Sequence, residues 1–249
     1  MRKLVCALAC RNNGSRLYGK PLQNLDPATG YTILEYMIDE INTLPEVDEI
    51  VLGISEGSEN VPFIEFAERK GLRYIIGDQT DVLKRLIDCA ILAEATDIFR
   101  VTSESPFIYF ELLKSAWDDH IQGDFDLTAP EMVPDGTAFE LIKLAAYVKS
   151  HEQGEQRHQS ELCSLYIREN KDTFSINPLE YPSALKRPDI RLTVDYPEDL
   201  VLCRAVYSQF KHLAPKIPLS KIIDYLDNEP ELTKLVAPYV PAGLETMYL

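Results

Sequence analysis

The sequence lacks any hydrophobic run long enough to span a bilayer, because no stretch approaches the roughly 20 apolar residues that a membrane helix needs. Its short apolar stretch near the start ends in arginine and asparagine and lacks the small-residue cleavage site of a signal peptide. We therefore expect no membrane insertion and a cytoplasmic location. The five cysteines form an odd set without a C-x-x-C pair, so we expect buried thiols and neither a disulfide framework nor a zinc knuckle.

Basic residues are in the minority, with 25 Lys and Arg against 40 Asp and Glu in 249 residues and a formal net charge of −15. This balance argues against binding to nucleic acid or to an anionic membrane surface. Acidic residues, in turn, are absent from residues 1–25. The five basic residues of that segment are Arg2, Lys3, Arg11, Arg16 and Lys20. A basic segment on an otherwise acidic chain is a candidate site for a small anion.

The composition, with 45% hydrophobic and 26% charged residues, is typical of a folded protein, and we treat residues 1–249 as a single domain. Residues 3–10 are apolar on both alternating faces, as in a central strand that is covered on both sides. Strands are expected at 3–10, 49–54, 73–76 and 98–102, and helices at 33–44, 61–70, 81–95 and 106–121. This alternation predicts an α/β fold with a Rossmann-like, doubly wound, mostly parallel sheet.

The alternation of strands and helices changes after residue 125, where a strand expected at 125–129 precedes helical patterns at 139–149 and 159–168. We interpret residues 133–181 as a helical insertion on the sheet. Its apolar residues include Phe139, Ile142, Ala146, Leu162, Leu165 and Tyr166. Because the sheet is not expected to cover these faces, we predict that the insertion forms the contact of a homodimer. A last strand at 190–194, a helix at 197–210 and a helical tail complete the expected fold.

Residues 14–20 read G-S-R-L-Y-G-K, which has the Walker A spacing up to the lysine. Walker A next requires a Ser or Thr whose hydroxyl binds Mg²⁺, whereas Pro21 has neither a hydroxyl nor a backbone N–H. We therefore reject a P-loop ATPase. The loop still follows a central strand, and open α/β sheets bind ligands at the carboxyl ends of their strands. Its charges predict phosphate binding.

Several stretches along the chain share the order and spacing of the motifs of a known enzyme family. Residues 11–20, R-N-N-G-S-R-L-Y-G-K, resemble the loop R-x-G-S-x-R-L-P-G-K. Residues 77–85, 100–108 and 192–200 resemble G-x-x-D-D-V-L-x-R, R-V-T-G-D-C-P-L-I and L-T-V-D-T-P-E-D-L, and residues 134–136 match a Y-P-D-G turn. The likeness extends to about residue 207. These motifs resemble those of the cytidylyltransferases. The resemblance is strongest to the spore-coat-polysaccharide type and includes the acylneuraminate and 3-deoxy-manno-octulosonate cytidylyltransferases.

The resemblance implies a fold of the nucleotide-diphospho-sugar transferase type and an Mg²⁺-dependent nucleotidyltransferase. Its substrates would be CTP and a small sugar acceptor, either a sugar phosphate or an ulosonic acid, and its products a nucleotide-sugar and pyrophosphate for polysaccharide or glycan synthesis. Departures from the motifs at Asn13, Tyr18, Glu104 and Ser105 leave GTP and UTP open as the nucleotide. No obvious base in the sequence chooses between the two acceptors.

Charge and resemblance together assign roles to the loop and its neighbours. Arg16 and Lys20 are expected to be catalytic, by stabilising charge on the phosphates. The expected nucleotide- and phosphate-binding residues are Arg11, Asn13, Gly14, Ser15, Arg16, Lys20, Asp81, Arg85 and Arg100. Asp81 is also placed to cap a helix, and Arg85 and Arg100 could instead hold the loop as buried arginines. The expected acceptor-binding residues are Asp135, Lys186 and Arg187. Arg191 completes a basic cluster with Lys186 and Arg187 that could bind a carboxylate or phosphate of the acceptor.

Glu104 and Asp195 are the candidate metal ligands. Each follows a predicted strand, which places both at the ligand-binding edge of the sheet, and Mg²⁺ prefers oxygen ligands. Asp195 also precedes a helix start at Pro197, where an acid interacts favourably with the helix dipole. For Glu198 and Asp199 we favour that helix-start role.

Two other functions stay open at this level. A nucleotide-sugar-dependent glycosyltransferase shares this kind of sheet but would be expected to carry a D-x-D motif, and residues 103–105 read S-E-S. A non-catalytic nucleotide-binding protein is the second alternative. Only the nucleotidyltransferase would release pyrophosphate.

Overall fold

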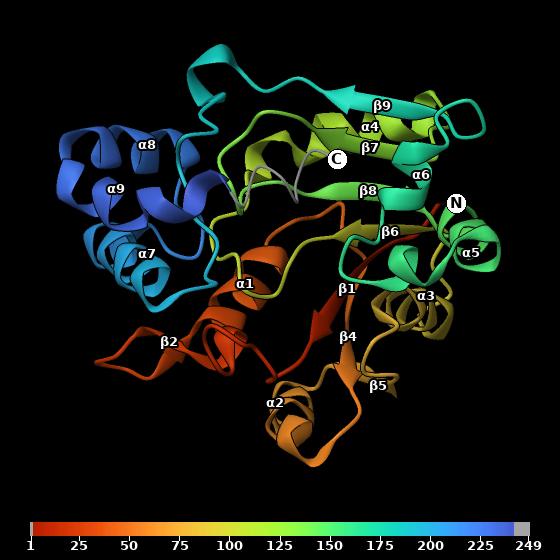
Figure 1. Cartoon of the computed structure of the whole chain (residues 1–249), viewed down its shortest axis with the longest axis horizontal. Helices are drawn as coiled ribbons and strands as arrows, with labels where there is room; N and C mark the ends of the chain where they lie inside the picture. The colour runs from red at the N-terminus through yellow and green to blue at the C-terminus, as the bar shows by residue number, and fades with distance from the viewer. Residues whose placement is uncertain (1, 242–249) are drawn as a thin grey trace.

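A seven-stranded sheet forms the centre of the computed structural model, which describes residues 2–241 (Figure 1). The strand order is β5-β4-β1-β6-β8-β7-β9. The strands are β1 (Leu4–Cys10), β4 (Glu49–Ser55), β5 (Arg73–Gly77), β6 (Asp97–Arg100), β7 (Leu127–Pro130), β8 (Glu140–Lys143) and β9 (Ile176–Leu179). A short ribbon pairs β2 (Asn24–Asp26) with β3 (Tyr31–Thr32).

The sheet is mostly parallel. β1 pairs in parallel with both β4 and β6, β4 with β5, and β7 with β9. β8 is antiparallel to β6 and to β7, so it alone among the described strands of this sheet runs against the others. The predicted doubly wound, mostly parallel fold is therefore confirmed. The carboxyl ends of β1 and β6 lie at the same edge of the sheet, which brings the loops that follow them together.

Helices cover both faces of the sheet, because alternate residues of β1 face opposite cores. Leu4, Cys6 and Leu8 pack into one core, and Val5 and Ala7 into the other. The first core is covered by α1 (Ile33–Ile41), α2 (Val61–Lys70), α4 (Leu113–Gln122), α7 (Pro197–Phe210), α8 (Leu219–Asn228) and α9 (Pro230–Val236). The second is covered by α3 (Val82–Leu92), α5 (Leu144–Gln153) and α6 (Leu165–Glu169). All five cysteines are free and buried, as predicted.

Local signals set several helix boundaries. Thr32 Oγ1 accepts a hydrogen bond from the Glu35 N–H at 3.1 Å, and the Glu35 carboxylate accepts one from the Thr32 N–H at 3.0 Å. This reciprocal capping box starts α1, as its spacing predicts. α2 ends at Gly71, whose φ of 68° is readily adopted only without a side chain.

The helix expected at 139–149 was wrong for its first half, because Glu140–Lys143 forms β8 and the helix starts at Leu144. Leu141 packs into one core and Ile142 into the other, and an apolar run buried on both sides does not reveal its period. The segment 133–181 thus contributes β8 and β9 to the central sheet. Phe139, Ile142, Ala146 and Leu165 are buried within the chain, which removes the apolar faces that motivated the dimer prediction.

Three other predicted elements need correction. Residues 190–194 form no strand of the main sheet, since only an isolated bridge joins Asp135 to Arg191. The helical pattern at 159–168 reduces to α6, and the helix expected at 106–121 begins at Leu113 after a short 3-10 turn.

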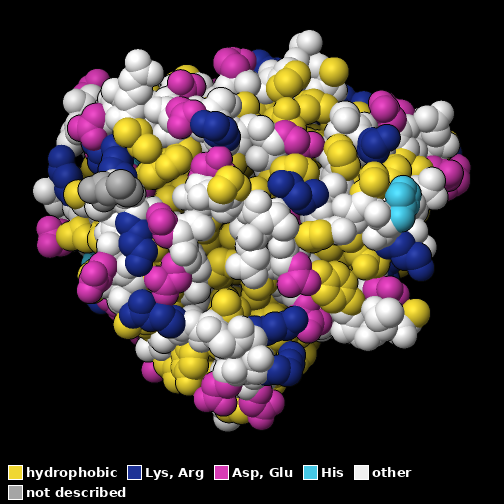
Figure 2. Space-filling view, turned by 180° about the vertical axis from the view of Figure 1, so that it is seen from behind, with side chains coloured by type: hydrophobic (Ala, Val, Ile, Leu, Met, Phe, Trp, Pro, Cys, Tyr) yellow, Lys and Arg dark blue, Asp and Glu magenta, His cyan; other side chains and the backbone are white. Residues whose placement is uncertain are grey.

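No helix within residues 2–241 is long and apolar enough to cross a membrane. On the face shown in Figure 2, Lys and Arg side chains are interspersed with Asp and Glu among the described residues and form no continuous basic patch.

Candidate active site

The loop after β1 is closed by a tight backbone turn. The Gly19 N–H donates to the Asn12 carbonyl at 2.9 Å, and Gly19 has a φ of 60° in the left-handed region. A Cβ atom at Gly14 would lie 2.3 Å from the Leu17 carbonyl oxygen, so the chain passes too closely there for any side chain. The two glycines of the motif are therefore required by the shape of the loop.

The base of the loop is fixed to the segment before α2. Asn12 is buried, and its N–H donates to Asn60 Oδ1 at 2.8 Å. Asn13, at the position where the resembled motif has glycine, donates to Glu59 Oε1 at 2.9 Å. This anchoring holds the loop at the carboxyl end of β1, where Arg11, Arg16 and Lys20 line a cavity.

The loop forms one wall of a cavity of about 370 Å³, which we call the first cavity. Asn13, Gly14 and Ser15 line it with their loop neighbours. Its charged lining residues are Arg11, Arg16, Lys20, Arg85, Arg100, Glu104 and Glu161. The structure thus brings together most of the residues predicted to bind phosphate, and cationic side chains dominate the lining.

A second cavity of about 410 Å³ adjoins the first, and the two share Arg16, Arg100, Glu104 and Glu161. Its other charged lining residues are Asp135, Glu140, Arg168, Arg191 and Asp195. Two aromatic rings, Tyr196 and Tyr239, stack face to face on its wall, with centroids 3.9 Å apart. The site therefore has two adjacent compartments that meet at Arg16, Arg100 and Glu104.

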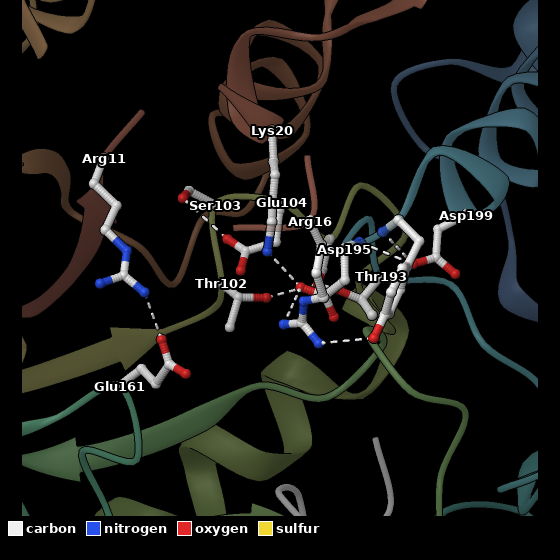
Figure 3. Close-up of polar contacts among 12 residues, drawn as sticks. Arg11, Arg16, Lys20, Thr102, Ser103, Glu104, Glu161, Thr193, Asp195 and Asp199 are labelled. Atoms are coloured by element: carbon white, nitrogen blue, oxygen red, sulfur yellow. Dashed lines mark hydrogen bonds and ion pairs between the residues drawn. The ribbon is translucent and has the colours of Figure 1, made fainter. Parts of the chain in front are cut away.

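Asp195 lies at the start of α7 and accepts hydrogen bonds from three cations (Figure 3). Its oxygens lie 2.5 Å from Lys20 Nζ, 2.6 Å from Arg191 Nη2 and 3.4 Å from Arg16 Nη2. Burial favours the protonated form of this carboxyl, but the positive charges of Lys20 and Arg191 outweigh it and lower the Asp195 pKa. Asp195 is therefore ionised and joins the basic loop to α7.

Glu104 follows β6 and lies beside the same lysine (Figure 3). The neighbouring Ser103 hydroxyl donates to the Ala9 carbonyl at 2.8 Å, which ties this segment to the end of β1. Burial raises the pKa of Glu104, and the charge of Asp195 raises it further, while Lys20 opposes both. Within residues 2–241, Glu104 has no ion-pair partner, so its carboxylate is available to a cation.

Arg191 connects three carboxylates and is buried. It pairs with Asp135, with Asp195 at 2.6 Å and with Asp199 at 2.9 Å. Asp199 also accepts from the N–H groups of Asp195 and Tyr196, both at 2.9 Å, so it caps α7 as its helix-start prediction says. Burial raises the pKa of Asp135 to about 6, although the charge of Arg191 opposes this.

Arg85 and Asp81, which were predicted to bind the nucleotide, make hydrogen bonds within the fold. Arg85 is 1% exposed and donates to the Gly53 carbonyl at 2.8 Å and to the Cys10 carbonyl at 3.3 Å, so it holds the ends of β4 and β1 under the first cavity. Asp81 caps α3 by accepting from the Lys84 N–H and also contacts His151 at 2.7 Å. It does not line either described cavity.

Only one of the three predicted acceptor-binding residues lies at the site. Asp135 lines the second cavity. Lys186 and Arg187 line neither described cavity, and they pair instead with Glu180, Asp189 and Asp227. Their sequence neighbour Arg191 is the cation that reaches the site.

Sequence analysis missed three charged lining residues of the second cavity, which are Glu140, Glu161 and Arg168. One usable signal was Glu140, a carboxylate inside the otherwise apolar run F-E-L-I, because a buried charge needs a partner. Glu161 and Arg168 lie in polar stretches whose pattern does not distinguish them from solvated residues.

The cytidylyltransferase family model matches residues 5–235 of this chain. The chain belongs to the cytidylyltransferase family. The expected family is thereby confirmed. The chain is 25% identical over 233 residues to an uncharacterised protein of Methanocaldococcus jannaschii, with 94% of each chain covered. It is 24% identical over 236 residues to the spore coat polysaccharide biosynthesis protein SpsF of Bacillus subtilis, covering 93% of this chain and 97% of SpsF.

Solved structures share the fold. A cytidylyltransferase from Leptospira borgpetersenii superimposes with a TM-score of 0.84 at 21% identity, covering 94% of this cytidylyltransferase and 97% of that chain. CMP:2-keto-3-deoxy-manno-octonic acid synthetase, solved with CTP, gives 0.62 at 15% identity and coverages of 83% and 99%. Rv0371c of Mycobacterium tuberculosis, solved with manganese, gives 0.56 at 13% identity and coverages of 82% and 99%.

Proposed function

We propose that this cytidylyltransferase uses Mg²⁺ to transfer the cytidylyl group of CTP to a small sugar acceptor, with release of pyrophosphate, for the synthesis of a surface polysaccharide or glycan. One observation carries the proposal. The basic loop and the two carboxylates meet at the junction of the two cavities, where Lys20 contacts Asp195 at 2.5 Å. Because CTP is a cytoplasmic metabolite, the proposal includes a cytoplasmic enzyme.

Nucleotidyl transfer gathers negative charge on the α-phosphate and on the departing pyrophosphate. Arg11, Arg16 and Lys20 would neutralise that charge from the first cavity. Arg16 is well suited because its side chain is 43% exposed and its contacts to Asp195 and Tyr196 are long, at 3.4 Å each. It can therefore turn to a phosphate without losing a strong partner.

The residues present fit a magnesium ion. Mg²⁺ usually takes one or two carboxylates and completes its shell with water and phosphate oxygens. Glu104 and Asp195 would hold it, since both line the second cavity and Glu104 has no cationic hydrogen-bond donor among the described residues. When bound, the ion would supply positive charge to the reacting phosphates. The manganese in Rv0371c is a precedent for a divalent cation in this fold.

CTP is the proposed nucleotide because the chain belongs to the cytidylyltransferase family and because a structural neighbour was solved with CTP. The second cavity is the proposed acceptor site. It lies beside Glu104 and Asp195, and it offers carboxylates and arginines that can hydrogen-bond to the hydroxyl groups of a sugar.

The test is a pyrophosphate-release assay with each of the four nucleoside triphosphates, Mg²⁺, and a panel of sugar phosphates and sugar acids. We expect release with CTP and an acceptor, and no release when either is omitted. Cleavage of a nucleotide-sugar without pyrophosphate would instead indicate a glycosyltransferase. Binding of CTP without turnover on any acceptor would indicate a non-catalytic nucleotide-binding protein.

A further inference from the structure

One acidic side chain of the first cavity has no role in the proposed chemistry. Five cationic side chains and two acidic ones line this cavity, and the two acidic ones are Glu104 and Glu161. Glu104 is a proposed metal ligand, whereas Glu161 lies between η4 (Gln156–Gln159) and α6, where the two cavities adjoin. Like charges repel, so a carboxylate on this wall opposes the binding of a polyphosphate.

Glu161 forms an ion pair with Arg11 of the basic loop (Figure 3). Glu161 Oε2 accepts a hydrogen bond from Arg11 Nη2 at 2.7 Å, although the two residues are 150 positions apart in the sequence. Both residues line the first cavity, so the pair joins the loop after β1 to the segment between η4 and α6 on the cavity wall. Figure 3 shows that Arg11 points towards Glu161 and lies apart from Lys20 and Asp195.

The backbone at Glu161 is fixed, while its side chain can leave Arg11. Arg100 Nη2 donates to the Glu161 carbonyl at 2.8 Å, and Arg100 is itself held by Glu140 at 2.9 Å. The side chains of Arg11 and Glu161 are 43% and 69% exposed. Ion pairs this exposed are weak, because water and salt screen their charges. The pair can therefore break without any movement of the segment that carries Glu161.

We propose that Glu161 competes with the phosphates of the nucleotide for Arg11, and so limits the affinity of the first cavity for polyphosphates. The inference rests on the proposed function and adds a regulating residue to that site. Arg11 can bind a phosphate only when it leaves Glu161. A phosphate can accept two parallel N–H bonds from a guanidinium, whereas Glu161 accepts one here. A triphosphate therefore displaces the carboxylate, and the competition reduces its net affinity.

The competition matters most when the products leave. Pyrophosphate carries several negative charges, and the five cations of the cavity would hold it strongly if nothing opposed them. Glu161 can pair with Arg11 again as pyrophosphate departs, because its backbone stays in place. Since product release limits the turnover of many enzymes, weaker binding of CTP is accompanied by faster release of pyrophosphate.

Binding of CTP to the wild type and to Glu161→Gln, measured by titration calorimetry with Mg²⁺ and without an acceptor, tests the competition. Glu161→Gln should lower the Kd for CTP by about threefold to tenfold, because the neutral amide releases Arg11 and removes one negative charge. Damage to the fold would weaken binding, so a gain in affinity distinguishes competition from a structural role. Glu180→Gln should leave the Kd unchanged, because Glu180 is an exposed, ion-paired glutamate that lines neither described cavity.

The same comparison in an Arg11→Gln background tests whether Glu161 acts through Arg11. There the gain from Glu161→Gln should shrink to less than about twofold, since no guanidinium is left to release. In steady-state assays, Glu161→Gln should lower the inhibition constant of pyrophosphate by about threefold or more.

Three results would overturn the inference and leave the proposed function standing. They are an unchanged or raised Kd for CTP in Glu161→Gln, a gain of the same size in the Arg11→Gln background, and an unchanged inhibition constant of pyrophosphate. No binding of CTP to the wild type would overturn the proposed function and the inference with it.

Discussion

Lys20 and Asp195 are 175 positions apart in the sequence, and their side chains meet at 2.5 Å. Lys20 lines the first cavity and Asp195 lines the second, so this ion pair links the proposed nucleotide site to the proposed acceptor site. Arg191 continues the link from Asp195 to Asp135 and Asp199. A change at either end of the pair therefore reports on both compartments.

Lys20→Ala should lower turnover by about 10² to 10³, which is the usual loss when one preorganised charge-stabilising group is removed. The fold should survive, because Asp195 keeps Arg191 as a partner. Lys84→Ala is the control, since Lys84 lies on the exposed surface of α3 and pairs with Asp88. Steady-state kinetics with CTP measures the change, and a loss below tenfold would show that Lys20 does not act on the phosphates.

Asp195→Asn and Asp199→Asn should separate metal binding from helix capping. Asp195→Asn should lower turnover by about 10² or more with little change in thermal midpoint, because it removes the charge of a proposed metal ligand while Arg191 keeps two carboxylates. Asp199→Asn should lower the free energy of unfolding by about 1 to 3 kcal/mol, since Asp199 is buried and pairs with a buried arginine.

Glu104 tests the same metal site with a conservative change. Glu104→Gln should lower turnover less strongly than Asp195→Asn, and Glu104→Asp should retain activity because the resembled motif has aspartate at this position. Turnover as a function of Mg²⁺ concentration measures both. Near-normal turnover of Asp195→Asn at limiting Mg²⁺ would rule out its role as a metal ligand.

Tyr239→Ala should raise KM for the acceptor by about tenfold. Its ring stacks on Tyr196, and the Arg16 guanidinium lies 4.9 Å from the Tyr196 ring centroid, so removing one ring loosens the wall of the second cavity. Aromatic pairs of this kind contribute about 0.5 to 1.5 kcal/mol. Tyr239→Phe keeps the ring and should behave like the wild type. Equal effects of the two variants on KM would show that the stacking of the two rings does not determine acceptor binding.

Glu40→Gln should stabilise the protein at neutral pH. Glu40 is fully buried, and neither carboxylate oxygen has a hydrogen-bond partner within residues 2–241. Burial raises the pKa of Glu40 well above 4.5, so the folded state keeps a proton that the unfolded chain releases. The free energy of unfolding therefore falls as the pH rises above 4.5, the pKa of the unfolded chain. The neutral amide should add on the order of 1 kcal/mol at pH 7.5 and little at pH 4.

Thermal midpoints of wild type and Glu40→Gln at the two pH values measure this difference. Glu65→Gln is the control, because Glu65 is an exposed glutamate on α2. A gain that is the same at both pH values would show that ionisation of Glu40 is not its cause.

The homodimer stays a prediction, now without the apolar faces that motivated it, because most of those residues are buried within the chain. Light scattering at micromolar concentration measures the mass directly. A dimer gives twice the 28.3 kDa of the chain, and a mass of one chain would contradict it.

Local patterns in the sequence were sufficient to predict the β-α alternation from β1 to α3. The capping box at Thr32, the strand 4–10 with two apolar faces and the acids in the first turn of α7 all act through neighbours a few residues apart. β8 could not be predicted, since burial on both faces erases the period that distinguishes a strand from a helix.

Sequence analysis predicted those parts of the site that depend on the charge of a residue and on its position after a strand. The basic loop and Glu104 follow central strands, and the carboxyl ends of parallel strands share one edge. The reason given for Asp195 was wrong, because no sheet strand precedes it, and it is placed by its contacts with Lys20 and Arg191. Pairings such as Glu140 with Arg168 join residues that lie 28 positions apart in separate elements, so they are known only once the fold is known.

Pyrophosphate release from CTP in the presence of Mg²⁺ and a panel of sugar phosphates and sugar acids, compared between wild type and Asp195→Asn, tests the proposed chemistry most directly. The structure predicts that the wild type forms pyrophosphate and nucleotide-sugar in equal amounts and that Asp195→Asn is slower by about 10² or more. No pyrophosphate from the wild type with any acceptor, or equal rates for the two proteins, would contradict it.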